Sequence, residues 1–141
     1  MKKRTTREIN FRVWDGEKMG AFHKPSISDE YGILCFEPVD YSDTINSFLD
    51  TEKYEFMQFT GLKDRNSKEI YEGDIVEFDH EILKFKGIGV VQWDNDGCWV
   101  CRPKERKLYF TLSSTSSFKV IGNIQQNPEL LETKEASNET R

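Results

Sequence analysis

Between Tyr54 and Ile124 the chain alternates short β-favouring runs with turn signals, and this pattern restricts the fold more than any other feature. Six runs are rich in Val, Ile, Phe, Tyr and Trp: YEFMQFT, DIVEF, IGVVQW, CWVCR, KLYFTL and FKVIGNI. Gly, Asp, Asn and Ser residues gather between them, as they do between the strands of small all-β domains. This spacing predicts a small barrel or sandwich.

The N-terminal part carries a separate β signal. In EINFRVW, residues 8–14, Ile9, Phe11 and Val13 alternate with polar residues, which is typical of a half-buried strand. Asp15-Gly16 then offers hairpin turn chemistry, and KMGAF supplies a return strand. We therefore expect a β-hairpin here. Prolines and glycines between residues 24 and 40 favour a loop with one short strand at GILCF.

One or two short helices are predicted. In YSDTINSFLD, residues 41–50, apolar side chains recur at helical spacing, and Asn127-Pro128 has the chemistry that opens a helical turn over ELL. The change of character near Tyr54 divides the chain into an N-terminal lobe, residues 1–55, and a β-barrel, residues 56–131. Residues 132–141 lack an apolar anchor and are predicted to form a disordered tail.

Charge argues against nucleic acid as the main partner. The 141 residues carry a formal net charge of −5, whereas proteins that bind duplex nucleic acid usually present clustered Lys and Arg. Basic clusters do occur within residues 2–7 and 102–107, and we interpret both as solvated surface. No apolar run approaches the roughly 20 residues that cross a bilayer, so we expect no membrane partner.

Cysteine usage indicates a reducing compartment. Three cysteines without regular spacing do not form a disulfide framework, and we expect a cytoplasmic protein. Cys98 and Cys101 form a lone CxxC, but a zinc site needs four ligands, and the other candidates, Cys35, His23 and His80, stand at no ligand-pair spacing. Residues three apart on a strand also point to opposite faces, so we interpret both as structural thiols.

No catalytic pattern is present in the chain. EFDHE, residues 77–81, contains metal-friendly side chains, but neighbours diverge in an extended chain, and a charged strand end or turn is the favoured interpretation. A phosphate-binding glycine loop, a GxSxG elbow and an HExxH motif are all absent from the sequence. We expect no catalytic residue, metal or cofactor, and predict that the chain is not an enzyme. A hydrolase with convergent carboxylates is the remaining enzymatic hypothesis.

Aromatic residues supply the candidates for binding. Exposed aromatics on small barrels stack on bases or anchor peptides. We favour core positions for Trp93 and Trp99, because large aromatics dominate small cores, and leave Trp14 open. Trp99 stays a weak binding candidate because it lies beside Arg102 and the basic cluster, and Trp14 and Arg102 are the other two candidates.

Four blocks of sequence, in this order, resemble the YopX family of phage and prophage proteins: REINFRVWD (7–15), FMQFTGLKDRNSKEIYEGDIVEF (56–78), GVVQWD (89–94) and VIGNIQQNPELLE (120–132). The second and fourth are distinctive. The resemblance implies a β-rich protein whose C-terminal part is an SH3-like small barrel, encoded by a phage or prophage in a bacterial cell. It implies no established biochemical activity.

Polar residues of the second block are interpreted as turn formers rather than ligand contacts. Asp64 to Ser67 makes a tight reversal, and where the family commonly has Asn-Gly this chain has Asn66-Ser67. A two-residue type I′ turn would require positive φ at both. The structural turn residues are Gly61, Asn66, Ser67, Gly73, Asp74 and Gly97.

The leading functional hypothesis is a non-enzymatic accessory protein that binds protein, either a second copy of itself or a host or phage protein. It combines the lack of a catalytic pattern with a small β domain and surplus aromatics. The alternative is a nucleic-acid-binding small β-barrel, which rests on the cluster at Arg102–Lys107 beside Trp99.

Overall fold

The computed structural model describes residues 8–28, 33–38, 55–105, 107–112 and 116–132. These residues form a mainly β protein with a curled half-barrel sheet, which confirms the predicted fold class. The chain divides into two compact units, Met1–Gly61 and Leu62–Arg141. The boundary predicted from the sequence is at residue 55. In the structure the units meet within strand β4 (Glu55–Lys63), where Gly61 has a φ of 87°.

The first sheet has the order β3-β2-β1-β4-β5. Its strands are β1 (Phe11–Trp14), β2 (Met19–Ser28), β3 (Ile33–Pro38), β4 and β5 (Glu69–Tyr71). The predicted hairpin is present, since β1 pairs antiparallel with β2 and the amide of Asp15 donates to the carbonyl of Lys18. Val13, Met57 and Phe59 are buried in the first unit.

The short strand predicted at GILCF is present as β3, but the loop predicted from residue 24 is wrong for residues 24–28. Strand β2 continues to Ser28, and β3 pairs with it from Ile33 to Pro38. Proline is tolerated in a strand where the ladder is interrupted, and the register shifts between His23 and Pro25. A bulge therefore accommodates the residue that the sequence interpretation took as a strand breaker.

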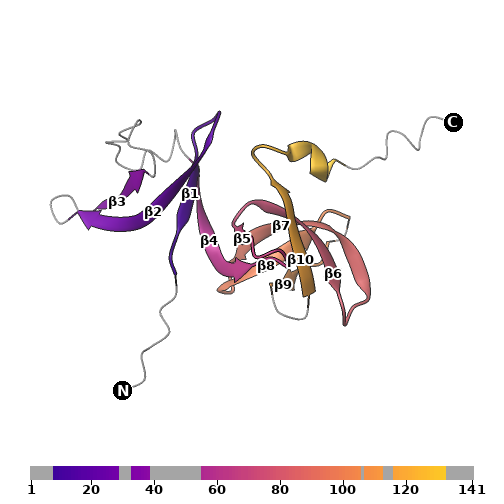
Figure 1. The fold of residues 1–141 in the computed structure, drawn as a ribbon. Helices are drawn as coiled ribbons and strands as arrows, with labels where there is room; N and C mark the ends of the chain where they lie inside the picture. Colours follow the sequence, from indigo (N-terminus) through magenta and orange to yellow (C-terminus); the bar gives the residue numbers. More distant parts are fainter. Residues whose placement is uncertain (1–7, 29–32, 39–54, 106, 113–115, 133–141) are drawn as a thin grey trace, which may run out of the picture. The chain divides into compact units, whose positions relative to one another are not determined.

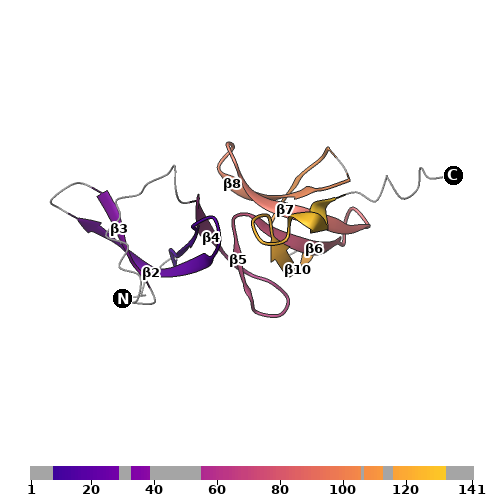
Figure 2. The ribbon, with the colours of Figure 1, turned by 90° about the horizontal axis from the view of Figure 1, so that it is seen from above.

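The second sheet has the order β10-β6-β7-β8-β9, with antiparallel pairing throughout. Its strands are β6 (Asp74–His80), β7 (Phe85–Asp94), β8 (Cys98–Pro103), β9 (Phe110–Thr111) and β10 (Ser116–Asn123). Figure 1 shows these strands curving around one another, and Figure 2 shows them from above with the short helix η1 (Pro128–Leu131) in yellow after β10. The run KLYFTL yields only the two-residue strand β9.

Aromatic rings fill the centre of the second unit. Phe78 meets Phe85 and Phe110 edge to face, with ring centroids 5.1 and 5.0 Å apart, and Phe110 stacks on Phe118 at 6.0 Å. Such pairs add to the stabilisation from burial. The buried cluster consists of Ile70, Val76, Phe78, Val91, Cys101, Phe110 and Phe118. The core thus draws on β5 through β10.

Two glycines on the inner face of β7 allow this packing. A Cβ at Gly89 would lie 2.6 Å from Cys101 Sγ and 2.8 Å from the carbonyl oxygen of Arg102. A Cβ at Gly87 would lie 3.2 Å from the ring of Phe78, its cross-strand partner. Strand β7 therefore approaches β8 at a separation that only glycine permits at position 89.

The predicted helical turn at the C-terminal end is a single 3-10 turn, η1, with Pro128 in its first turn. Asn127 is its N-cap residue but makes no side-chain cap bond. The helix expected within residues 41–50 and the tail from residue 133 lie outside the described residues. Among the residues that are described, no helix has the length and apolar character needed to cross a bilayer.

Candidate functional site

Asp64 organises the polar stretch that separates β4 from β5. Its Oδ1 accepts hydrogen bonds from the amides of Asn66 (2.8 Å) and Lys68 (2.9 Å), and its Oδ2 accepts one from the amide of Val120 on β10 (2.9 Å). The amide of Arg65 donates to the carbonyl of Phe118, also on β10, at 2.9 Å. This turn is therefore fastened to an edge strand of the curled sheet.

Charge on Asp64 is stabilised by the same contacts. Burial raises the pKa of the carboxyl group, but the hydrogen bonds from the amides of Val120, Lys68 and Asn66 outweigh it, so the net pKa is lowered. Amide donors favour the ionised form because they point at the carboxylate oxygens. Asp64 is buried, with 8% of its surface exposed. Its carboxylate therefore stabilises the folded structure by accepting backbone hydrogen bonds.

The turn itself has three loop residues, so the two-residue type I′ interpretation is wrong. The amide of Asp64 donates to the carbonyl of Lys68, and the amide of Ser67 donates to the carbonyl of Asp64. Ser67 has a φ of 64°, whereas Asn66 is not among the described residues with positive φ. A tight turn followed by one left-handed residue is the usual three-residue hairpin connection. The Asp64 carboxylate stabilises this turn by accepting hydrogen bonds from the amides of Asn66 and Lys68.

Gly73 and Asp74 connect three segments of the second unit. Gly73, with a φ of 83°, donates its amide to the carbonyl of Val91 and accepts a bond from the amide of Ile124. Asp74 is buried, and its Oδ2 accepts a hydrogen bond from the amide of Tyr71 at 2.8 Å. Both residues act within the fold, and neither forms part of an open site. Gly97, with a φ of 94°, lies in the β7–β8 turn.

The block VIGNIQQNPELLE forms a second polar turn. Asn123 is buried, and its Oδ1 accepts hydrogen bonds from the amides of Gln125 and Gln126. The side-chain oxygen of Asn127 accepts a hydrogen bond from the amide of Asn123. A Cβ at Gly122 would lie 2.6 Å from that Asn127 oxygen, so glycine leaves room for the Asn127 side chain. The distinctive polar residues of this block thus build a turn.

Of the aromatic candidates, Trp99 packs against the buried core while remaining half-buried, and its Nε1 is enclosed without an acceptor among the described residues. Trp93 meets it edge to face at 5.0 Å but leaves 48% of its surface exposed. The core position favoured for Trp93 is therefore wrong. Trp14, half-buried at the end of β1, lies across from Met19 and Glu55.

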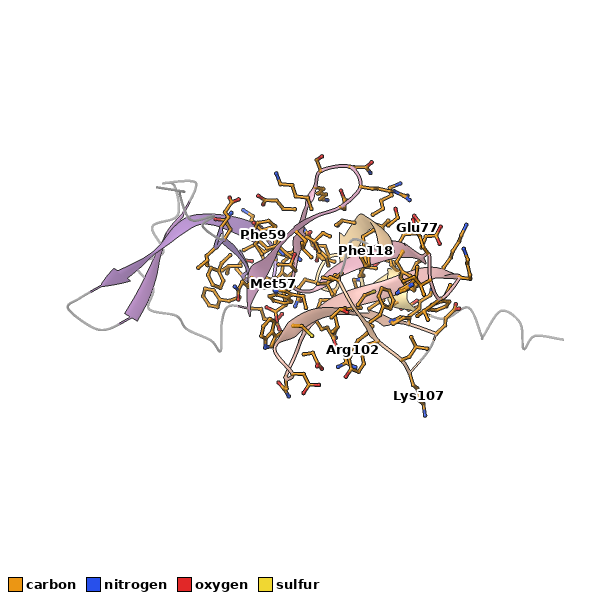
Figure 3. All side chains as sticks on the ribbon, turned by 90° about the horizontal axis from the view of Figure 1, so that it is seen from below. Met57, Phe59, Glu77, Arg102, Lys107 and Phe118 are labelled. Carbon is orange, nitrogen blue, oxygen red and sulfur yellow. The ribbon has the colours of Figure 1, made fainter. Side chains whose placement is uncertain are left out.

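Arg102 is held by contacts within its own unit. Its guanidinium forms an ion pair with Asp94 at 3.3 Å and lies 4.5 Å from the centre of the Tyr109 ring. Lys104 Nζ donates to the carbonyl of Leu130 at 3.4 Å. Figure 3 shows Arg102 and Lys107 on the side of the second unit opposite Glu77. Two members of the basic cluster are thus occupied by the fold.

Cys98 and Cys101 lie on strand β8 but in different surroundings. Cys101 belongs to the buried core, and burial raises the pKa of its thiol to about 12. Cys98 is half-buried near the turn. Within the described ranges, no three His, Cys, Asp or Glu side chains gather closely enough to hold a metal ion.

The turn between β6 and β7 carries the most exposed apolar residues of the described chain. Ile82 exposes 72% and Leu83 53% of its surface. We name residues 81–84 the apolar tip. The amide of Leu83 donates to Nδ1 of the buried His80, whose ring meets Phe110 edge to face at 5.0 Å. The tip is therefore anchored to the core.

Ile82 and Leu83 were not among the binding candidates that the sequence supplied. Residues 77–81 were interpreted as a charged strand end or turn, and β6 does end at His80. Strand β7 begins at Phe85, so Ile82 and Leu83 fall on a short turn. The available signal was an apolar pair in a turn position that lacks Gly, Pro, Asn and Ser.

The comparisons with known proteins agree with the signature residues. The YopX protein family matches residues 10–132 of the chain. This chain belongs to the YopX family. None of the curated proteins matches the YopX-family chain described here.

Two solved structures share the fold with this YopX-family chain. Protein EF1440 from Enterococcus faecalis is 28% identical, with a TM-score of 0.54 over 90% of this chain and 100% of that one. Protein yopX from Bacillus subtilis is 24% identical, with a TM-score of 0.53 over 87% of this chain and 98% of that one. Neither name states an activity.

Proposed function

We propose that this YopX-family chain is a non-enzymatic accessory protein that binds another protein through the apolar tip of its β6–β7 hairpin. Its setting would be the cytoplasm of a bacterial cell that carries the encoding phage or prophage. The exposure of Ile82 and Leu83 is the observation that carries this proposal. Contiguous exposed apolar surface marks interaction sites on soluble proteins, and these two side chains are neighbours on one anchored turn.

Anchoring matters because a preformed surface loses less conformational entropy on binding. His80 accepts a hydrogen bond from the amide of Leu83, and the His80 ring lies against Phe110 of the core. Lys84 adopts a φ of 50°, a left-handed conformation that closes the turn. Full burial of one Leu or Ile side chain contributes about 1.5–3 kcal/mol. Burial of both side chains against a partner would therefore stabilise a small interface.

Polar residues elsewhere support the same proposal indirectly. Asp64 and Asn123, which give the family blocks their character, are buried and satisfied by backbone amides. The fold thus engages both polar side chains, whereas Ile82 and Leu83 are exposed. The surface available to a partner is thus apolar at the tip.

Nucleic-acid binding is the alternative that the geometry supports less well. Arg102 faces Asp94 and Tyr109, and Lys104 faces the carbonyl of Leu130. A phosphate chain would have to displace these contacts. Titration of labelled single- and double-stranded DNA and RNA tests the alternative: submicromolar binding with a steep salt dependence would support it and count against protein docking.

Quantitative capture from a bacterial lysate tests the proposal. Tagged wild-type protein, the tip variant Ile82→Ser/Leu83→Ser and the control Leu108→Ser/Ile124→Ser would be compared. The control removes the same residue types at sites that are 40% and 36% exposed. We expect one protein to be recovered with wild type and control in equal amount, and at least tenfold less with the tip variant. Sedimentation velocity of the pure protein tests whether that partner is a second copy.

Loss of folding would be visible as a lower urea midpoint, and we expect none, because both tip residues are exposed. Equal recovery by the tip variant and the control, or no specific recovery combined with a strict monomer, would contradict the proposal.

A further inference from the structure

A charged cleft lies on the sheet surface formed by β6 and β7. Its volume is about 340 Å³, and its lining includes Arg65, Glu77, Asp79, Lys86 and Ile88. Clefts of roughly 300–1,000 Å³ are the usual size of small-ligand sites. Figure 3 shows Glu77 at the surface of the second unit and Phe118 inside it. We name this feature the β6–β7 cleft.

Strand register fixes how its charges are arranged. Glu77 and Asp79 are two residues apart on β6, so they share one face about 7 Å apart. Ile88 pairs with Glu77, and Lys86 pairs with Asp79. The cleft therefore has one end with Glu77 and Ile88 and another with Asp79 and Lys86.

Arg65 reaches the cleft from the Asp64 turn. The amide of Arg65 is bonded to the carbonyl of Phe118 on β10, and Lys119 of β10 pairs with Glu77 of β6. This places the guanidinium 3.9 Å from the Glu77 carboxylate. The family turn thereby delivers one cation to the cleft.

The internal ion pairs of the cleft are loose. Arg65 Nη2 lies 3.9 Å from Glu77, and Lys86 Nζ lies 3.7 Å from Asp79, whereas strong charge-assisted hydrogen bonds measure about 2.7–2.9 Å. All four side chains are about half exposed or more. Exposed pairs of this kind contribute little to stability, so a ligand can replace them.

We propose that the β6–β7 cleft binds an extended polypeptide segment whose side chains i and i+2 carry opposite charges. The acidic side chain pairs with Arg65 and the basic one with Asp79, because an extended ligand repeats the two-residue spacing of β6. The carboxylates of Glu77 and Asp79 would repel a polyanion in this cleft.

This inference is independent of docking at the apolar tip. The test titrates ¹⁵N-labelled protein with the capped peptide Thr-Glu-Val-Lys-Thr at low salt, with amide chemical shifts as the readout. We expect saturable shifts at Gly87 and Ile88. The same-charge peptides Thr-Glu-Val-Glu-Thr and Thr-Lys-Val-Lys-Thr should bind at least roughly fivefold more weakly.

Variants identify the contact. Arg65→Glu should weaken peptide binding at least roughly fivefold, whereas Lys107→Glu, the same charge change at an exposed site outside the cleft, should not. The swap Arg65→Glu/Glu77→Arg returns a cation to the same end of the cleft and should bind the peptide more tightly than Arg65→Glu alone, which separates recognition from folding. Ile82→Ser/Leu83→Ser should bind the peptide like wild type.

The inference is overturned if the cleft amides do not shift at millimolar peptide, or if all three peptides bind equally. Equal shifts with free glutamate and lysine, or stronger binding of a ten-nucleotide DNA strand, would overturn it as well.

Discussion

Asp64 is the residue on which most of the polar turn depends. Its carboxylate accepts hydrogen bonds from three backbone amides in two segments of the second unit. Without the carboxylate, each amide would lose this acceptor. Hydrogen bonds to a charged acceptor contribute more than neutral ones. The side chain therefore joins the local turn to the distant strand β10.

Asp64→Ala should lower the free energy of unfolding by about 2–3 kcal/mol, because three amides lose their acceptor. Asp64→Asn should cost less, since the amide group keeps one acceptor oxygen. Urea denaturation measures both. An alanine variant within about 0.5 kcal/mol of wild type would show that water replaces the carboxylate.

Stability should also depend on pH through Asp64. Its folded pKa is lowered below the ordinary value of 3.8, so the unfolded chain binds the proton more readily. The contribution is fully present above the unfolded pKa and is lost as pH falls through the folded pKa. Urea midpoints measured from pH 6 to pH 3 should therefore fall less in Asp64→Asn than in wild type. Parallel curves would contradict this assignment.

Ser67→Gly should stabilise the protein by a few tenths to about 1 kcal/mol. Ser67 has a φ of 64°, where glycine avoids the cost of a side chain, although glycine also gives the unfolded chain more freedom to lose. The expected observation is a higher urea midpoint with an unchanged slope. Ala at this position is the control and should not stabilise. A less stable glycine variant would mean that the Ser67 side chain contributes to the turn.

At the scale of elements, close approach of β7 and β8 determines how the core packs. Gly89 and Gly87 lie two residues apart on β7 with the same orientation, but a Cβ at Gly89 meets backbone atoms of Arg102, whereas one at Gly87 meets the ring of Phe78. A ring can shift by a few tenths of an ångström, and paired backbone cannot do so without breaking the ladder.

Gly89→Ala should therefore destabilise the fold by about 1–3 kcal/mol, and Gly87→Ala should cost clearly less. Thermal and urea unfolding of the two variants, which carry the same substitution on one strand, provide the comparison. Equal effects would indicate that strand propensity, rather than the contact with β8, determines the result.

Much of the element order was predictable from sequence. The alternation of Phe11 and Val13 predicted the first strand, although Ile9 precedes that strand and is 48% exposed. The runs around Val76, Val91 and Val100 predicted the centre of the curled sheet, because period-2 patterns reflect burial. Strand β2 was cut short because Pro25 reads as a breaker, and a bulge is not visible in composition.

The site was less predictable for a physical reason. Exposure of Ile82, Leu83 and Trp93 depends on where strands end and which neighbours cover them, and these are tertiary facts. Likewise, the carboxylate of Asp64 accepts a hydrogen bond from the amide of Val120, which lies far along the chain. Arg102 was selected as a binding candidate from the basic cluster beside Trp99, but its contacts with Asp94 and Tyr109 depend on the register of β7, β8 and the segment before β9.

At the scale of the whole molecule, the family blocks and the exposed surface have different roles. The blocks supply buried carboxylates and amides that hold turns, and the apolar tip carries the two most exposed large apolar side chains of the described residues. Buried polar groups must find partners inside the fold, so the turn residues are fixed by folding. We propose that partner choice lies with the tip and the β6–β7 cleft.

Site-specific photocrosslinking in a bacterial cell that produces the protein tests docking at the tip most directly. Leu83→p-benzoylphenylalanine places the reactive group at the tip, and Leu108→p-benzoylphenylalanine places it at another exposed leucine. The account predicts one discrete adduct from position 83, absent from position 108 and lost when Ile82→Ser is added. No adduct at position 83, or adducts of equal yield from both positions, would contradict it.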